Sequence, residues 1–189
     1  MNILCDELPK SIDIDGAEYE INTDFRVWIR IDLLLSANKA DEIDRLYALT
    51  KAVMLCYKVL PPNIQRAVEG MAEFYRGTQK QCGGTGGKKA IYSFEHDSEY
   101  ILSSFMYDYN IDLTAVNMHW YKFKALFASL SDDTMFVKIM QYRSVDLGKI
   151  KDKEQKRFYR RMKRVYALPD GRTEEEKERD MAQMLSGMM

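Results

Sequence analysis

The chain has 189 residues, a formal net charge of −1, 46% hydrophobic residues and 30% charged residues. This length predicts one domain with room for a terminal hairpin or tail, and the apolar content is sufficient for a buried core. The nearly neutral charge argues against a protein that binds nucleic acid through overall positive charge.

The cysteine spacing and the first twenty residues indicate in which cellular compartment the protein is expected. There are three cysteines with no CxxC pair, which argues against a disulfide framework or a zinc ribbon. The first twenty residues are acidic and contain no apolar run, so they do not resemble a secretory signal. The longest apolar run, Leu33 to Leu35, is too short to cross a bilayer. We therefore expect a soluble, intracellular protein.

The first predicted element is a β-hairpin over residues 11–21. Ile12 and Ile14 alternate with polar residues, and the same alternation returns at Tyr19 and Ile21. The pair between the two runs, Asp15-Gly16, tolerates the positive φ angles of a two-residue turn. A lone hairpin is only marginally stable in water, so one face of it should pack against the rest of the chain.

Helices are predicted from residue 25 onward, after the capping residues Asn22, Thr23 and Asp24. Residues 25–35 are apolar on most sides and predict a buried helix. A second helix is predicted over residues 41–57. Its inner face is expected to consist of Ile43, Leu46, Tyr47, Val53, Met54 and Tyr57. A third helix follows Pro61-Pro62, with inner positions Ile64, Ala67, Val68, Met71 and Phe74.

A glycine-rich segment, residues 77–90, predicts a flexible linker between two lobes. The expected division is residues 1–76 (hairpin and helices), 77–90 (linker), 91–168 (an aromatic-rich helical lobe with a basic last helix) and 169–189 (an acidic, Met-bearing C-terminal helix). The predicted fold is mainly α, a helical bundle with a small N-terminal β-hairpin. The sequence leaves open whether the two lobes share a core.

The second lobe is predicted to be helical throughout, with large apolar side chains facing inward. Trp120, Phe123 and Phe127 are expected in the core. Ser131, Asp132 and Asp133 are expected to cap the helix that follows them. The expected inner stripes are Ile101, Leu102, Phe105, Met106 and Tyr109; Trp120, Phe123, Leu126, Phe127 and Leu130; Phe136, Ile139 and Met140; and, over about residues 151–166, Phe158, Met162, Val165 and Tyr166.

No arrangement of groups in this sequence predicts catalysis. The glycine-rich segment resembles a phosphate-binding loop only weakly, because Lys89 stands where Ser or Thr should hold the metal ion and a helix is predicted upstream. Cys56 falls on a helical apolar stripe, where a buried thiol is the usual interpretation. Nothing marks an activated cysteine. We expect a protein that is not an enzyme and has no catalytic or cofactor-binding residues.

Metal ligation is also weakly supported. The candidate ligands are Cys82, Glu95, His96, Asp97 and His119. His96 and Asp97 are adjacent and would not share a helical face, and no HExxH or Cys/His pairing accompanies them. His119, beside Trp120, is better interpreted as a partly buried, hydrogen-bonded side chain. No metal site is therefore predicted.

Two segments are candidate partner-binding surfaces. The first is the basic helix, represented by Lys153, Lys156, Arg157, Arg160, Arg161 and Arg164. It could contact an acidic protein or phosphates, or it could be neutralised by the acidic residues that follow it; nucleic acid is the less favoured partner. The second is the C-terminal stripe of Met181, Met184, Leu185 and Met188. Methionines adapt to varied partners, and this stripe could dock in a groove or pack back on its own bundle.

One set of residues in the second lobe resembles a known family. The set is Phe94-x-x-Asp97, Tyr100-Ile101, Phe105, Tyr109-x-Ile111-Asp112-Leu113, His119-Trp120-x-x-Phe123-x-x-Leu126, Leu130, Phe136, Ile139 and Arg143, followed by the Lys-rich helix. These residues, with Leu8-Pro9, the Asp15-Gly16 hairpin and the Asp24-Phe25-Arg26 helix entry, resemble the bacteriophage gene-product-fifteen family over about residues 1–168. Tyr121 departs mildly from the pattern, because the family often has Trp there.

The resemblance implies a role in phage tail assembly. Genes of this family lie ahead of the tape-measure gene in phages and prophages of Gram-positive bacteria, where long-tailed phages encode tail assembly chaperones. It thus implies a non-enzymatic chaperone in the host bacterial cytoplasm that binds the tape-measure protein. Further partners would be the major tail tube protein, a sister chaperone or a second copy of the chain. The alternatives are a structural tail or neck component, and a nucleic-acid-binding protein that uses residues 149–164.

Overall fold

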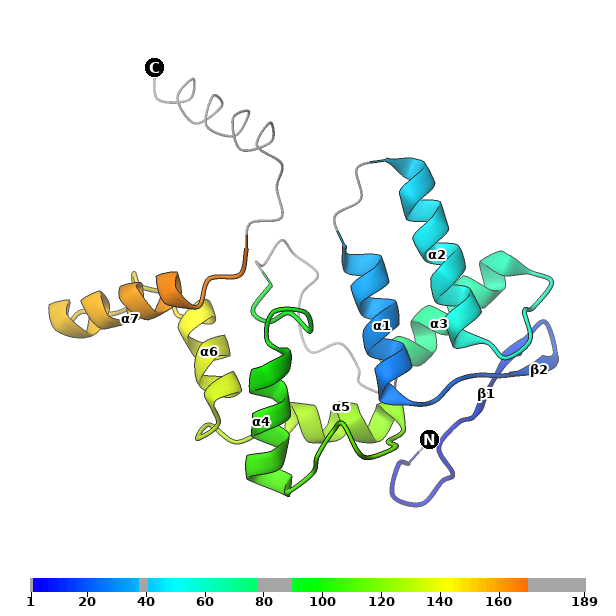
Figure 1. The fold of residues 1–189 in the computed structure, drawn as a ribbon, viewed down its shortest axis with the longest axis horizontal. Coiled ribbons are helices and arrows are strands. Elements are labelled where there is room, and N and C mark those ends of the chain that lie inside the picture. Colours follow the sequence, from blue (N-terminus) through cyan, green and yellow to red (C-terminus); the bar gives the residue numbers. More distant parts are fainter. Residues whose placement is uncertain (1, 38–40, 78–89, 170–189) are drawn as a thin grey trace.

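The computed structural model describes residues 2–37, 41–77 and 90–169. Within these ranges the chain forms seven helices and one two-stranded antiparallel hairpin, so the predicted mainly α fold is confirmed (Figure 1). The elements are β1 (Ser11–Ile14), β2 (Ala17–Glu20), α1 (Phe25–Ser36), α2 (Glu42–Cys56), α3 (Ile64–Arg76), α4 (Ser98–Tyr109), α5 (Trp120–Ala128), α6 (Met135–Ser144) and α7 (Lys153–Val165). Most of the predicted linker and the predicted C-terminal helix, including Met181, Met184, Leu185 and Met188, lie outside the described residues.

The hairpin forms as predicted, and its turn explains its register. Asp15 and Gly16 have φ angles of 53° and 84°, the positive values that a two-residue turn needs. Ile12 therefore pairs with Tyr19. The hairpin packs on α3 at Gly70, where an added Cβ would lie 2.8 Å from Ile12 Cγ2. Glycine at this position lets the strand and the helix approach closely.

Helix α1 begins at the predicted cap but is only partly buried. The Asp24 carboxylate accepts a hydrogen bond from the backbone N–H of Arg26 at 2.9 Å. Phe25, Trp28 and Ile31 face the core, whereas Leu35 near the helix end is exposed. The expectation of burial on most sides was therefore wrong, because α1 packs through one face only.

Helix α2 packs through a different face from the predicted one. Four of the six residues expected inside are exposed: Ile43, Leu46, Tyr47 and Met54. Only Val53 and Tyr57 of that set are buried. The face that meets the core instead carries the small residues Ala48, Ala52 and Cys56. Small side chains let α2 lie close against α1, which leaves the larger apolar residues on the outer side.

Helix α3 follows the prediction closely. Ala67, Met71 and Phe74 are buried and Val68 is half-buried, whereas Ile64 in the first turn is exposed, contrary to expectation. Asn63 caps the helix by accepting a hydrogen bond from the Arg66 backbone N–H at 3.2 Å. The first turn extends beyond the hydrophobic core, which is why Ile64 stays in solvent.

A single hydrophobic core runs through both lobes. The Trp28 ring of α1 lies 4.6 Å from that of Phe74 on α3 and 6.3 Å from that of Trp120 on α5. Phe123 of α5 stacks on Phe25 of α1 at 4.8 Å and on Phe105 of α4 at 5.3 Å. The question that the sequence left open is thus answered: the two lobes share a core, and α5 lies at its centre (Figure 1).

The helices of the second lobe bury most of their predicted stripes. Ile101, Phe105, Phe136 and Ile139 are buried as expected, whereas Met106 is exposed. The predicted cap of α6 was also wrong. Thr134 caps this helix by accepting a hydrogen bond from the Val137 N–H at 3.4 Å. Ser131 instead donates through its backbone N–H and its hydroxyl to the carboxylate of Asp108, at 2.7 and 2.8 Å.

A buried ion pair fixes the second lobe. The Asp97 carboxylate, which is almost fully buried, accepts two hydrogen bonds from the Arg143 guanidinium of α6 at 2.6 and 2.8 Å. The same guanidinium donates to the carbonyl oxygens of Ile91 and Tyr166, at 3.1 and 2.5 Å. Arg143 thereby connects the segment before α4 with α6 and the end of α7. Asp97 is committed to this pair rather than free for metal binding.

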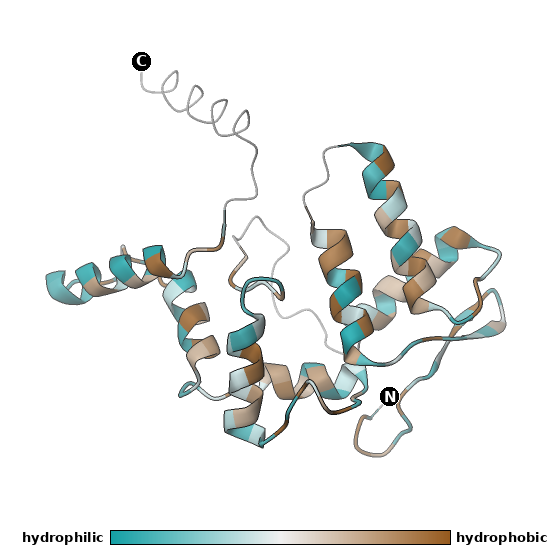
Figure 2. Cartoon of the chain, viewed as in Figure 1, coloured by the Kyte–Doolittle hydropathy of each residue, from teal (hydrophilic) through white to brown (hydrophobic). Residues whose placement is uncertain are grey.

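Helix α7 extends away from the other described helices, and its main contacts among the described residues are with α6 and the segment that joins them (Figure 1). Phe158 and Val165 were predicted to face inward, yet both are exposed, and no residue of α7 is fully buried. Met162 and Tyr166 are half-buried. Hydrophilic residues dominate its surface (Figure 2). Since α6 is the main neighbour of α7 in the described part of the chain, their contact covers only part of the predicted apolar stripe.

Candidate partner-binding surfaces

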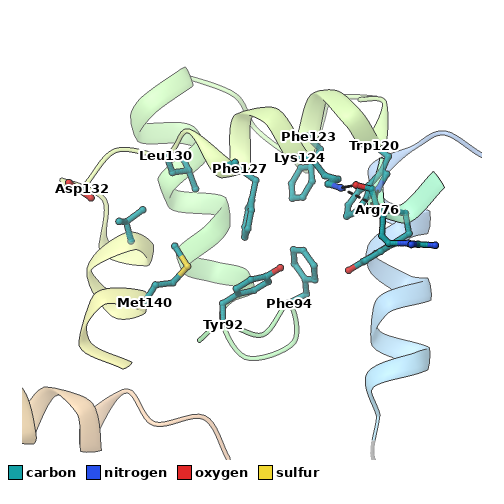
Figure 3. Close-up of a pocket in the computed structure, with 13 residues that line it drawn as sticks. Arg76, Tyr92, Phe94, Trp120, Phe123, Lys124, Phe127, Leu130, Asp132 and Met140 are labelled. Carbon is teal, nitrogen blue, oxygen red and sulfur yellow. Dashed lines mark hydrogen bonds between the residues drawn. The ribbon is translucent and has the colours of Figure 1, made fainter. Parts of the chain in front are cut away.

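A cavity lined by aromatic side chains lies between α5, α6, the end of α3 and the segment before α4 (Figure 3). Its volume is about 880 Å³. Figure 3 shows Tyr92 and Phe94 facing Phe123 and Phe127 of α5 across the cavity. The lining residues are Tyr75, Arg76, Tyr92, Phe94, Trp120, Phe123, Lys124, Phe127, Ala128, Leu130, Asp132, Val137 and Met140. The charged members are Arg76, Lys124 and Asp132, so the cavity is mostly apolar.

Two side chains of α5 hold the end of α3 in place beside this cavity. The Trp120 indole donates a hydrogen bond to the Tyr75 carbonyl oxygen at 3.0 Å. The Lys124 ammonium donates to the carbonyl oxygens of Tyr75 and Arg76, at 2.9 and 2.5 Å. A cation at a helix C-terminus is favourable because the last carbonyls carry partial negative charge. Burial lowers the pKa of Lys124 from its ordinary value. Lys124 thus acts as a cap, with half of its side chain covered.

The start of α5 is fixed by His119, which serves as its N-cap. The Nδ1 atom accepts a hydrogen bond from the Tyr121 backbone N–H at 3.1 Å, so this nitrogen carries no proton. Nε2 lies 3.0 Å from the Pro9 carbonyl oxygen and donates to it. Burial lowers the pKa of His119, consistent with this neutral form. The predicted role of a partly buried, hydrogen-bonded histidine is confirmed.

The phenols on the cavity side are also neutral. The Tyr75 hydroxyl donates a hydrogen bond to the Asp32 carboxylate. Burial first, and then this carboxylate, raise the pKa of Tyr75 above its ordinary value. Burial and the same carboxylate raise the pKa of Tyr92 as well. These phenols therefore contribute apolar rings and hydrogen bonds, and no activated oxygen.

The cavity is suited to apolar side chains of a partner. The ring centroids of Tyr92 and Phe127 are 5.3 Å apart, and those of Phe123 and Phe127 are 5.6 Å apart. Such rings offer large apolar surfaces, and the charged groups at the edge can orient a bound segment.

The basic helix places its predicted contact residues in solvent. Lys153, Arg157, Arg160, Arg161 and Arg164 are exposed and Lys156 is half-buried. Asp152 caps the helix through a hydrogen bond from the Gln155 N–H at 2.7 Å. The four predicted residues of the C-terminal stripe lie outside the described residues.

Within the described ranges, no three His, Cys, Asp or Glu side chains come together as metal ligands would. Cys56 is buried, so the prediction of a buried thiol is confirmed, and burial raises the pKa of this thiol to about 12. In the same ranges, every helix is too short or too polar to span a bilayer.

Two surfaces were missed from the sequence. The aromatic cavity was not predicted, because its walls come from four segments that are distant in the chain; the density of rings between Tyr92 and Phe127 was the available signal. The exposed face of α2 was also missed. The repeat of small residues at Ala48, Ala52 and Cys56 was the signal for the true inner face.

Comparison with known proteins gives one match. A family model described as Bacteriophage Gp15 protein matches residues 4–168, which is most of the chain. No curated protein and no solved structure matches. The match includes the hairpin, all seven described helices and every residue that lines the aromatic cavity.

Proposed function

The chain belongs to the bacteriophage Gp15 protein family, and from this premise we propose that it is a non-enzymatic tail assembly chaperone that binds the tape-measure protein in the host cytoplasm. Family membership supports the coarser statement, a phage structural or assembly protein. A tape-measure protein is largely a long amphipathic helix, whose apolar stripe promotes aggregation until the tail tube encloses it. A chaperone for such a client needs an apolar receptor on its own surface.

The aromatic cavity is the observation that carries this proposal. It has a volume of about 880 Å³, ring-bearing walls and charged groups at its edge, Arg76, Lys124 and Asp132. Large side chains from one face of a client helix could enter it, while the charged edge contacts the polar flanks of that helix. Repeated binding along one long client would strengthen overall attachment even where each contact is weak.

The basic helix α7 is proposed as a second contact. Its exposed cations are Lys153, Arg157, Arg160, Arg161 and Arg164. Such a helix favours acidic segments of the client, the tail tube protein or a sister chaperone. Exposed surface cations such as these affect the choice of partner and the rate of association more strongly than the affinity of the complex.

The central test is co-expression of the full chain with the tape-measure protein of the same phage. The tape measure should become soluble and co-purify with the chain. Ala128→Trp places a large ring at the cavity mouth, where Ala128 is exposed, and should weaken capture about tenfold. Ala125→Trp is the matched control, because Ala125 is exposed on α5 outside the cavity lining.

Two results would contradict the proposal. Equal capture by the two tryptophan variants would exclude the cavity as the client site. A tape-measure protein that stays insoluble in the presence of the chain would exclude the chaperone role itself.

The alternative of a structural tail or neck component is separated by mass spectrometry of purified virions. A chaperone leaves before the particle is finished and should be missing from it, whereas a structural component should be present in fixed copy number.

The alternative of nucleic-acid binding is favoured only by the exposed cations of α7. A gel-shift series with increasing salt separates it from protein binding, since contacts to phosphates weaken steeply with salt.

A further inference from the structure

The outer face of α2 carries an apolar stripe that no described part of the chain covers. The exposed fractions are 77% for Ile43, 65% for Leu46, 60% for Tyr47 and 55% for Met54. We call these four residues the α2 stripe. Single exposed apolar residues are ordinary on protein surfaces, but a contiguous row of large ones marks an interaction site.

The α2 stripe is straight because of its spacing. Ile43, Tyr47 and Met54 are four and seven residues apart, so they align along one side of the helix, with Leu46 beside them. This side lies opposite the small inner residues Ala48 and Ala52. At 1.5 Å per residue, the stripe is about 16 Å long. It is therefore long enough for a helix of similar length to pack along it.

The stripe continues into a groove between α1 and α2. The groove has a volume of about 620 Å³ and an apolar floor that includes Leu33 and Leu34 of α1 and Met54 of α2. Arg30 and Lys51 border it. Side chains of a helix lying on the α2 stripe can enter this groove, which adds apolar contact beyond the stripe itself.

Charges along α2 identify the occupant. At its start, Asp41, Glu42 and Asp44 outweigh Arg45, whereas Lys51 is the charged residue of its second half. The helix is thus acidic at one end and basic at the other. An antiparallel helix with the same charge order places each acidic end against a basic end, and the two helix dipoles then also oppose each other favourably.

One pair of charges fixes the arrangement more closely. Asp44 and Lys51 are seven residues apart, so both lie on the same edge of the α2 stripe. A two-fold axis that relates antiparallel helices brings the same edges of both helices together. If the axis passes near the middle of the stripe, Asp44 of each copy lies beside Lys51 of the other.

From these observations we infer that the chain self-associates through α2, with the α2 stripes of two copies packed antiparallel about a two-fold axis. The contact packs the four stripe residues of one copy against those of the second copy, and it forms two symmetric Asp44–Lys51 ion pairs beside the α1–α2 grooves. This inference is independent of the proposed function, because the aromatic cavity lies on other elements.

The test measures the mass of the full chain by sedimentation equilibrium over a wide concentration range. The wild-type chain should form a dimer. Asp44→Lys alone, or Lys51→Asp alone, creates two like-charge contacts and should weaken the dimer at least about tenfold. An equimolar mixture of the two variants should regain the dimer, because each chain then offers the charge that the other needs. High salt should reduce these differences.

Controls separate this contact from loss of structure. Lys122→Asp reverses an exposed charge on α5 and should leave the dimer unchanged. Leu46→Glu should give a monomer whose far-UV circular dichroism matches the wild type, since Leu46 is already exposed. Its thermal melting should match that of the wild type at chain concentrations low enough for the wild type to be monomeric.

Three outcomes would overturn the inference. They are a wild-type chain that stays monomeric at every concentration, charge variants whose mixture does not regain the dimer, and a chain that dimerises only after deletion of residues 170–189. The last result would mean that the chain's own C-terminal segment occupies the stripe. None of them bears on capture of the tape measure, which the Ala128→Trp comparison tests separately.

Discussion

Helices α2 and α3 are neighbours with similar apolar content, yet they use it in opposite ways. On α3 the large residues Met71 and Phe74 are buried. On α2 the large residues Leu46 and Tyr47 are exposed, and Ala48, Ala52 and Cys56 form the inner face. The difference shows that an apolar stripe on a helix can face either the core or the solvent. A stripe of small residues on the opposite side of the helix distinguishes the two cases.

The largest expected effect comes from truncating the inner face of α3. Phe74→Ala should lower the free energy of unfolding by about 3–5 kcal/mol, because the ring packs on Trp28 at 4.6 Å and on Tyr121 at 4.7 Å. Met54→Ala on α2 is the matched control and, at a chain concentration low enough for the monomer, should change it by less than about 0.5 kcal/mol. Urea titration followed by tryptophan fluorescence measures both. Equal losses would mean that the two helices do not differ.

A smaller effect is expected from enlarging the inner face of α2. Ala52 is fully buried, so Ala52→Leu should destabilise the fold by about 1–3 kcal/mol through overpacking against α1. Thr50→Leu, on the exposed side of the same helix, should be nearly neutral. Thermal melting of both variants checks the orientation of α2. If Ala52→Leu left the melting temperature unchanged and Thr50→Leu lowered it, the assignment of the inner and outer faces of α2 would be wrong.

The smallest expected effect is a pH dependence of folding stability that is caused by His119, which lies on the α3 side of the core. The His119 ring lies 5.8 Å from the Phe74 ring, and its pKa is lowered in the folded state. Its neutral form is therefore the stabilising one. The contribution is fully present above the unfolded pKa of about 6.5 and declines as the pH falls below that value.

Loss of the Nδ1 acceptor removes an N-cap, so the decline between about pH 7 and about pH 5 should amount to roughly 1 kcal/mol. His119→Asn keeps a capping oxygen without a titrating group and should show a flatter stability profile over this range. Urea midpoints at several pH values measure the difference. A variant with the same slope as the wild type would assign the pH dependence to other groups.

Local features were predictable from the sequence because they depend on a few adjacent residues. The Asp15-Gly16 turn and the cap at Asp24 occur where they were expected. The Thr134 cap was misassigned by a few residues, since Ser131 is held by Asp108 in a neighbouring helix. A cap is thus predictable only where no distant partner competes for the capping side chain.

The choice of the inner face could not be predicted with the same success. Periodicity identified a stripe on α2 at Ile43, Leu46, Tyr47 and Met54, but burial depends on which face a neighbouring helix approaches. The same limit applies to α7, where Phe158 and Val165 are exposed because, among the described elements, mainly α6 packs against it. The aromatic cavity was unpredictable for a related reason, since its walls come together only when four distant segments pack.

By itself, the sequence determined the mainly α fold, the hairpin, the number and approximate bounds of the described helices and the resemblance that the family match confirmed. These depend on local turn chemistry, helical periodicity and ordered motifs. Only the tertiary structure decided that the lobes share one core, that Asp97 pairs with Arg143 and that the large side chains of α2 face outward. The physical reason is that these outcomes depend on contacts between residues far apart in the chain, where close packing selects among faces that are equally apolar in sequence.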